Sequence, residues 1–187
     1  RLISCSNCTV SPIAITLYPL MQIANITSVK IFTQQALSGG GRILLAQGRA
    51  GRQINSEIPG EAGSIITELT KILSSEFDIE ASCERVMRDH GHYARIEVEF
   101  GEPISAHQVV RAWRESYSRS QELNLPSATK KPIIFVDGEL DDNHRWVGFE
   151  QYKHPGLDLK AAMAVAVGEV EINGSTLRFS TMSDNTI

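Results

Sequence analysis

The feature that most constrains the fold is a pair of segments in which apolar and charged residues alternate. They span residues 77–87 and 93–100. In the second segment the apolar positions are Ala94, Ile96, Val98 and Phe100. They alternate with the charged residues Arg95, Glu97 and Glu99. Successive side chains of a β-strand point to opposite faces, so this period of two predicts strands with one face packed and one face in water. The chain must therefore build a sheet that is covered on one side.

Three helices are predicted to supply that cover. Residues 12–24 are mostly apolar, as in a helix that faces a core. Residues 64–75 place isoleucine and leucine at helical spacing behind Ser64, a suitable N-cap. The run Ser105-Ala106-His107-Gln108 is a capping box, whose side chains satisfy the first free N–H groups of a helix.

Further strands are predicted over residues 26–35, 133–136, 162–172 and 176–182, with Asn173-Gly174 as a hairpin turn between the last two. Residues 42–63 lack clear periodicity and are predicted to form a long excursion, and residues 118–131 a polar linker. The predicted fold class is α+β, with a mixed, largely antiparallel sheet and helices packed on one face. We expect one domain over residues 1–187.

Composition argues against several classes of protein. The 187-residue chain has a formal net charge of -4, which provides no basic surface for nucleic acid or for a membrane. No apolar run approaches the roughly 20 residues of a membrane span. An odd number of cysteines, three, indicates a reducing compartment, so we expect a cytoplasmic protein. The chain has no initial methionine and both ends look cut, so we expect a domain of a longer protein.

The segment Ser4–Pro12 is the first place where chemistry is expected. Ser11 and Pro12 suit an N-cap and the first helical position, which places Cys8 in the turn just ahead of a helix. Unpaired N–H groups and the positive end of the helix dipole favour a thiolate there, the nucleophilic form of cysteine. The alternative is that Cys8 is a small buried apolar residue.

Two kinds of chemical site are compatible with Cys8. Cys5 and Cys8 form a C-x-x-C pair, typical of redox centres or, with His90 and His92, of a zinc site. Alternatively, a histidine holds the sulfur ionised or moves protons beside it. His92 follows a glycine at a strand end, a suitable place for such a group. The other histidines are His90, His107, His144 and His154, and position alone does not decide among them.

An ordered series of short motifs resembles the aspartate-semialdehyde dehydrogenase family. Gln35 follows Cys8 by 27 positions and His92 follows Arg85 by seven, as the family pattern requires. The motifs run in the family's order from residue 4 to residue 185 and are Ser6-Asn7-Cys8-Thr9, Gln34-Gln35-Ala36-Leu37-Ser38-Gly39-Gly40-Gly41, Glu68-Leu69-Thr70-Lys71-Ile72-Leu73, Cys83-Glu84-Arg85 with His92, the strand Ala162–Val170, and Ser183-Asp184-Asn185.

The resemblance implies a fold like the C-terminal domain of glyceraldehyde-3-phosphate-dehydrogenase-type enzymes. The implied reaction is the NADP-dependent interconversion of aspartyl phosphate and aspartate semialdehyde, in the biosynthesis of lysine, threonine and methionine. Cys8 would be the nucleophile and carry a thioester, and Asn185, Ser38 and Gly39 would bind the cofactor. A homodimer or tetramer, a small-molecule substrate and no metal are also implied. An NADP-binding domain would precede this chain, so we expect the isolated chain not to oxidise NADPH.

The resemblance also implies roles for five other residues. His92 would be the acid/base group, and Gln35 would orient the acyl group. Arg85 would bind the substrate carboxylate, and Glu61 would bind the substrate amino group. Asn7 would contact phosphate or the oxyanion. These roles agree with chemistry, because a carboxylate suits a bidentate guanidinium and an oxyanion suits neutral donors near the thiol.

One departure from the family concerns positive charge. The family usually carries a lysine three positions after the glutamate that corresponds to Glu61. In this chain that position is Ser64. Our hypothesis is that Arg88 or Arg42 supplies the missing charge. The departure leaves two alternatives open: a related acyl-phosphate or acyl-CoA semialdehyde dehydrogenase with a different substrate, and a non-catalytic dimerising relative.

Overall fold

The fold is built on one six-stranded mixed sheet. The computed structural model describes residues 5–148 and 160–186. The strand order is β2-β1-β3-β6-β5-β4. The strands are β1 (Ile26–Gln35), β2 (Asp78–Arg85), β3 (His92–Phe100), β4 (Ile133–Phe135), β5 (Val165–Asn173) and β6 (Thr176–Ser183). The outer pairs β1–β2 and β4–β5 are parallel and the three inner pairs are antiparallel. The predicted α+β class is therefore confirmed.

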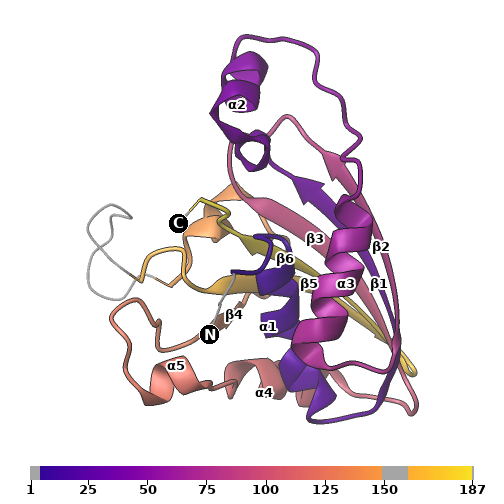
Figure 1. The fold of residues 1–187 in the computed structure, drawn as a ribbon. Helices are drawn as coiled ribbons and strands as arrows, with labels where there is room; N and C mark the ends of the chain where they lie inside the picture. Colours follow the sequence, from indigo (N-terminus) through magenta and orange to yellow (C-terminus); the bar gives the residue numbers. More distant parts are fainter. Residues whose placement is uncertain (1–4, 149–159, 187) are drawn as a thin grey trace.

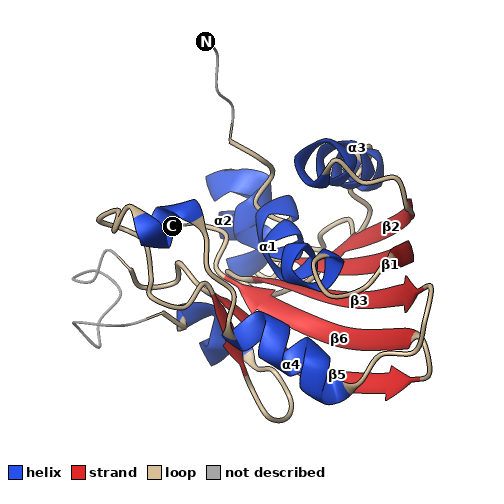
Figure 2. Ribbon diagram, turned by 90° about the horizontal axis from the view of Figure 1, so that it is seen from below, coloured by secondary structure: helices blue, strands red, loops and turns tan. Residues whose placement is uncertain are grey.

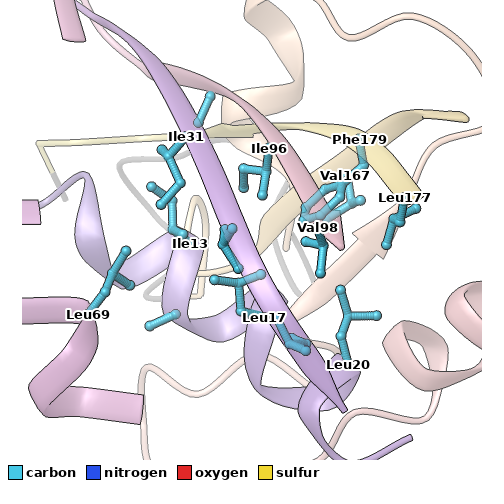
Figure 3. Close-up of a cluster of buried hydrophobic side chains, with 14 of the residues drawn as sticks. Ile13, Leu17, Leu20, Ile31, Leu69, Ile96, Val98, Val167, Leu177 and Phe179 are labelled. Atoms are coloured by element: carbon cyan, nitrogen blue, oxygen red, sulfur yellow. The ribbon is translucent and has the colours of Figure 1, made fainter. Parts of the chain in front are cut away.

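Three helices cover one face of this sheet (Figures 1 and 2). They are α1 (Val10–Met21), α3 (Glu61–Leu73) and α4 (Ala106–Arg114). Helix α1 contacts both α3 and α4, so it is the centre of the helical layer. Its residues Ile13, Leu17 and Leu20 pack in the buried cluster with side chains from β1, β3, β5 and β6 (Figure 3). The alternation along β3 is reflected in its burial, which leaves Glu97 on the opposite face, where no helix of the described residues packs.

Two helices begin earlier than the sequence predicts. Helix α1 begins at Val10 with Thr9 as N-cap, rather than at Pro12 with Ser11 as N-cap. The reason is Asn7, whose carbonyl accepts from the N–H groups of Val10 and Ser11. Helix α3 begins at Glu61, and Ser64 is not its N-cap. Here Gly60 takes a positive φ of 77° that turns the chain into the helix three residues before Ser64.

The predicted excursion and linker contain helices that the sequence pattern did not show. A 3₁₀ turn (η1, Leu37–Gly40) leads into α2 (Gly41–Arg49), which projects beyond the end of the sheet (Figure 1). A Cβ atom at Gly48 would lie 2.3 Å from Leu37, so this packing depends on a bare Cα and not on apolar periodicity. The segment 118–131 contains a short helix, α5 (Arg119–Glu122). A further 3₁₀ turn, η2 (Asp142–Trp146), follows β4.

The other local predictions are confirmed or shift by a few residues. Ser105 and Gln108 form the predicted capping box at the start of α4. The hairpin after Asn173 joins β5 and β6, and its Gly174 has a positive φ of 61°. Strand β5 begins at Val165 rather than Ala162, which has a φ of 60° that a strand does not accept. His154 lies outside the described residues. Within those residues, no helix is long and apolar enough to cross a membrane.

Candidate active site

Three strand ends meet at one edge of the sheet and carry three of the predicted site residues. Gln35 is the last residue of β1 and Arg85 the last of β2, and the two are register partners in the parallel pair. His92 is the first residue of β3, which runs antiparallel to β1 and pairs Tyr93 with Gln34. Residues far apart in the sequence therefore lie side by side because of strand order and register.

The turn ahead of α1 brings Cys8 to this edge. The Cys8 Sγ lies 3.3 Å from Nε2 of His92. His92 itself is only 2% exposed. The Asn7 side chain shapes the turn, because its Oδ1 accepts from the Thr9 N–H at 2.8 Å. The structure thus places His92 beside the sulfur. His90 has no hydrogen-bond partner for Nδ1 among the described residues.

Glu61 connects the cysteine turn to β1. Its Oε1 accepts from Nε2 of Gln35 at 2.7 Å and from Nδ2 of Asn7 at 3.0 Å. The early start of α3 places this carboxylate in the first turn of the helix. One further residue, for which no role was predicted, supports the turn: Oε2 of Glu68 accepts from the Asn7 backbone N–H at 2.8 Å. The motif Glu68–Leu73 was its only sequence signal.

Arg85 and Gly39 also lie close to the His92 imidazole. Nη1 of Arg85 donates to the carbonyl of Ala36 at 2.8 Å. A Cβ atom at Gly39 would lie 2.9 Å from that Nη1 and 3.1 Å from Cε1 of His92. Only a bare Cα therefore leaves both side chains in place. The guanidinium has five N–H donors, so others remain for a substrate carboxylate.

Asn185, Ser38 and Gly91 form a hydrogen-bonded group next to His92. Nδ2 of Asn185 donates to Oγ of Ser38 at 3.0 Å, and Oδ1 of Asn185 accepts from the Gly91 N–H at 2.8 Å. The backbone also ties these segments together, since the Ser38 N–H donates to the Asp89 carbonyl at 3.0 Å. The Asn185 amide is thus held in one orientation beside the site.

Burial controls the charge of His92 and Arg85. It lowers the pKa of His92 to about 4, and the nearby Arg85 charge acts in the same direction. The ring is therefore neutral at neutral pH. Burial also lowers the pKa of Arg85, while the Glu61 carboxylate acts in the opposite direction. Arginine remains charged under such a shift.

The predicted preference of Cys8 for the thiolate is wrong. Burial of the sulfur raises the pKa of the Cys8 thiol, and the Glu61 carboxylate raises it further. Backbone N–H groups at Cys8 and Thr9 lower it, as expected at a helix start, but they are outweighed. Cys8 does lie just ahead of a helix, as predicted, but burial and the Glu61 carboxylate outweigh the effect of the helix start.

Replacing Glu61 with glutamine is expected to lower the pKa of the Cys8 thiol. The substitution removes a negative charge but keeps an oxygen that accepts from Gln35 and Asn7. More thiolate is then present at pH 7, although a less basic thiolate is also a weaker nucleophile. We expect alkylation of Cys8 by iodoacetamide at pH 7 to be roughly two- to fivefold faster. Peptide mass spectrometry measures Cys8 separately from the other cysteines.

Glu68→Gln is the matched control for this measurement. Glu68 also bonds Asn7, but it is not among the groups that shift the pKa of Cys8. Cys8 in the Glu68→Gln variant should therefore be alkylated at a rate close to that in the unsubstituted chain. An unchanged or slower rate in Glu61→Gln, with an unmoved pH midpoint, would contradict the electrostatic effect of Glu61.

The residues proposed to replace the missing lysine lie in different places. Nε of Arg88 is paired with Oδ1 of Asp142 at 2.7 Å, and the Arg88 charge contributes to the low pKa of His92. Arg42 lies on α2 and is exposed. Ser64 is exposed in α3. Of the two arginines, Arg88 is the one whose charge reaches the site.

A metal centre finds no support in this geometry. Among the described residues, no group of three or more His, Cys, Asp and Glu side chains is arranged to hold a metal ion. Cys8 and Cys83 form no disulfide with a described residue. The described contact of Cys8 with His92 corresponds to the cysteine–histidine alternative.

Curated relatives match nearly the whole chain. An aspartate-semialdehyde dehydrogenase from Aspergillus fumigatus is 31% identical over 97% of this chain, and one from Methanothermobacter thermautotrophicus is 26% identical over 97%. A malonyl CoA reductase (NADP) from Metallosphaera sedula is 29% identical over 96%. The chain spans about half the length of these relatives, 52% to 53%. No protein-family model matches the sequence.

Solved structures share the fold. An aspartate semialdehyde dehydrogenase with NADP from Candida albicans has a TM-score of 0.74 at 23% identity and covers 100% of this chain and 53% of its own. An aspartate semialdehyde dehydrogenase II from Vibrio cholerae has a TM-score of 0.73 at 18% identity, over 98% of this chain and 56% of its own. These likenesses confirm the resemblance found in the sequence, and the chain is a relative of the aspartate-semialdehyde dehydrogenases that matches about half of their length.

Proposed function

We propose that this chain carries the acyl-transfer site of a semialdehyde dehydrogenase, with β-aspartyl phosphate as the acyl donor. The observation that carries the proposal is the contact of Cys8 Sγ with Nε2 of His92 at 3.3 Å, beside a carboxylate and a guanidinium. A nucleophilic sulfur next to an imidazole is the arrangement required for a covalent acyl intermediate. Similarity to enzymes named aspartate-semialdehyde dehydrogenase supports this donor.

The proposed acyl transfer uses the chain's own residues. The Cys8 sulfur attacks the carbonyl carbon, a C–S bond forms, and the C–O bond to phosphate breaks. Phosphate leaves with the bonding electron pair, the thiol proton passes to solvent, and a thioester remains on Cys8. Negative charge develops on the carbonyl oxygen, where the His92 ring and the Asn7 amide are near enough to provide neutral donors.

Charge complementarity favours a substrate with both an amino group and a carboxylate. Both hydrogen bonds to Glu61 within the described residues go to Oε1, which leaves Oε2 for an ammonium group. The Arg85 guanidinium presents further N–H donors for a carboxylate. Binding of an ammonium at Glu61 would also neutralise the carboxylate that raises the pKa of Cys8. The substrate itself would then help to ionise the nucleophile.

The residues next to His92 also fit NADP, which when bound supplies or accepts the hydride. Asn185 is held by Ser38 and Gly91, so its amide is oriented to pair with a carboxamide. Gly39 is exposed, and a side chain there would occupy the space beside His92 and Arg85. We propose that these residues contact the nicotinamide end of the cofactor.

A second candidate is acyl transfer from a coenzyme A thioester. Ser64 removes a positive charge that would attract phosphate, and a relative of this chain is a malonyl CoA reductase (NADP). Malonate has no amino group, so this reading leaves Glu61 without a cationic partner in the substrate. For that reason we favour the aspartyl donor.

The two candidates are separated by offering each donor to the chain. We expect β-aspartyl phosphate to acylate Cys8 and release about one phosphate per chain, as measured by intact mass and a phosphate assay. Malonyl-CoA should give much slower acylation and release of coenzyme A. Faster acylation by malonyl-CoA would transfer the proposal to the second candidate. Acylation of Cys8 by neither donor would contradict both.

A further inference from the structure

Thr9, the residue after the proposed nucleophile, has a buried hydroxyl with no hydrogen-bond partner among the described residues. The residue as a whole is only 2% exposed. A buried hydroxyl without a partner is costly, because folding removes it from water and does not replace the lost hydrogen bonds. Such groups are rare in folded proteins and often mark a functional position.

Thr9 is the N-cap of α1, but its hydroxyl does not cap the helix. An N-cap side chain normally accepts from the backbone N–H two or three positions later. Here the third position is Pro12, which has no N–H, and the second is Ser11, whose N–H already donates to the Asn7 carbonyl at 3.2 Å. The Thr9 backbone also has helical dihedral angles, φ -79° and ψ -34°, rather than the extended angles of an ordinary N-cap. The helix start therefore leaves the hydroxyl available for another use.

The Cys8 sulfur is the neighbouring group whose charge changes when the nucleophile forms. Burial and the Glu61 carboxylate raise the pKa of the Cys8 thiol, and a hydrogen bond from the Thr9 side chain lowers it. A neutral thiol sulfur is a weak acceptor, whereas a hydrogen bond to a charged acceptor is much stronger. The hydroxyl therefore lacks an ordinary partner while Cys8 is a thiol, and it gains one when Cys8 ionises.

We propose that Thr9 is a further catalytic residue, whose hydroxyl donates a hydrogen bond to the Cys8 sulfur once that sulfur is a thiolate. An interaction that forms only in the reactive state favours that state, whereas an interaction present in both states does not. The role adds a neutral donor from the cysteine turn itself. It leaves unchanged the acid/base role that the family resemblance implies for His92. The part that concerns acyl transfer rests on the proposed function.

The other groups around the sulfur show why a further donor is useful. Nε2 of His92 on β3 lies 3.3 Å from the Cys8 Sγ. Glu61 on α3 carries a negative charge that opposes a second negative charge on Cys8. Arg85 on β2 interacts favourably with a negative charge on the sulfur. Because burial also weakens solvation by water, a donor held in place by the fold replaces part of what the thiolate loses.

Replacing Thr9 with valine tests this role without any acyl donor. Valine keeps the branched shape and removes the hydroxyl, so the pH midpoint of Cys8 alkylation by iodoacetamide should rise by about 0.5–1 pH unit. A rise of one unit leaves about tenfold less thiolate at pH 7 and makes that thiolate about threefold more nucleophilic. We therefore expect alkylation at pH 7 to be about two- to fourfold slower. Peptide mass spectrometry follows Cys8 separately from the other cysteines.

Two further variants separate the hydroxyl from other effects of the substitution. Thr9→Ser keeps a hydroxyl and should retain the pH midpoint of the unsubstituted chain. Thr33→Val removes a second buried hydroxyl, on β1, that has no partner among the described residues and does not shift the pKa of Cys8. Its midpoint should also stay unchanged. A midpoint unmoved in Thr9→Val, or moved equally in Thr9→Ser or in Thr33→Val, would overturn the proposal.

Urea unfolding followed by circular dichroism distinguishes this role from that of a helix cap. The hydroxyl has no ordinary partner while Cys8 is a thiol, so Thr9→Val should unfold at pH 7 at the same urea concentration or at a higher one. Loss of an N-cap hydrogen bond would instead lower the unfolding midpoint. A lower unfolding midpoint together with an unmoved alkylation midpoint would assign Thr9 to the cap and refute the proposal.

Acyl transfer from β-aspartyl phosphate extends the test to the proposed reaction. Acylation of Cys8 in Thr9→Val at pH 7 should be slower by a similar factor, about two- to fourfold, because the thiolate is the attacking form. If neither acyl donor reacts while the alkylation midpoints agree with expectation, the proposed function fails and the assignment of Thr9 stands. If acylation is observed and the alkylation midpoint of Thr9→Val is unmoved, the assignment of Thr9 fails and the proposed function stands.

Discussion

Replacing Cys8 with serine is expected to reduce phosphate release from β-aspartyl phosphate by at least about a thousandfold. A serine hydroxyl has almost no ionised form at neutral pH. Serine would therefore keep the shape of the side chain and lose the nucleophile. The measurement is single-turnover phosphate release together with the mass of the chain.

Cys83→Ser is the matched control for Cys8→Ser. The Cys83 Sγ makes one long contact, 3.9 Å, with the carbonyl of Ile58. It is the same type of residue on β2, so its loss should leave most of the phosphate release intact. Acylation that persists in Cys8→Ser and disappears in Cys83→Ser would show that the nucleophile has been assigned to the wrong cysteine.

Replacing Trp113 with alanine is expected to destabilise the fold by about 3–5 kcal/mol. Trp113 is only 1% exposed and is the largest of the fully buried side chains. Its Nε1–H donates to the Thr16 carbonyl of α1 at 3.0 Å, and its ring centroid lies 4.9 Å from that of Phe179 on β6. One side chain thus joins α4, α1 and the sheet. Since a domain has about 5–15 kcal/mol of stability in total, the loss would be a large part of it.

Urea unfolding followed by circular dichroism measures this loss. Trp113→Phe should keep the ring contact and lose the hydrogen bond, at a smaller cost of about 1–2 kcal/mol. Tyr117→Ala, close in sequence but 62% exposed, is the surface control and should change the free energy of unfolding by less than about 0.5 kcal/mol. A cost below about 1 kcal/mol for Trp113→Ala would contradict its role in joining the layers.

Much of the fold was predictable because its signals are local. The alternation along β3, the capping box at Ser105 and the apolar stripe of α3 each depend on residues within one or two turns of chain. The start of α1 was less predictable, because Asn7 satisfies the first N–H groups from outside the helix. Helix α2 was missed because it packs through Gly48, and a residue without a side chain leaves no periodic signal.

The predicted site residues were found from motif spacing, and the structure brings them to one edge of the sheet. These residues come from separate elements. A hydrogen bond joins Cys8 to His92, and Gln35 is hydrogen-bonded to Glu61 and is the register partner of Arg85. No role was predicted for two further contributors, Glu68 and the backbone of Ala36. A backbone amide leaves no trace in the residue type, so Ala36 was not open to sequence reasoning. The homodimer or tetramer stays a prediction.

The sequence by itself determined most of the strands, the three helices that cover the sheet, the faces that they bury and the residue types available for chemistry. These properties follow from side-chain period, capping and spacing along the chain. Tertiary structure alone decided which histidine meets Cys8, which nitrogen of that ring faces the sulfur, and whether the thiol ionises readily. The pKa values of Cys8 and His92 depend on burial and on groups tens of residues away. Electrostatic and hydrogen-bonding effects act through space, and only the folded chain sets those distances.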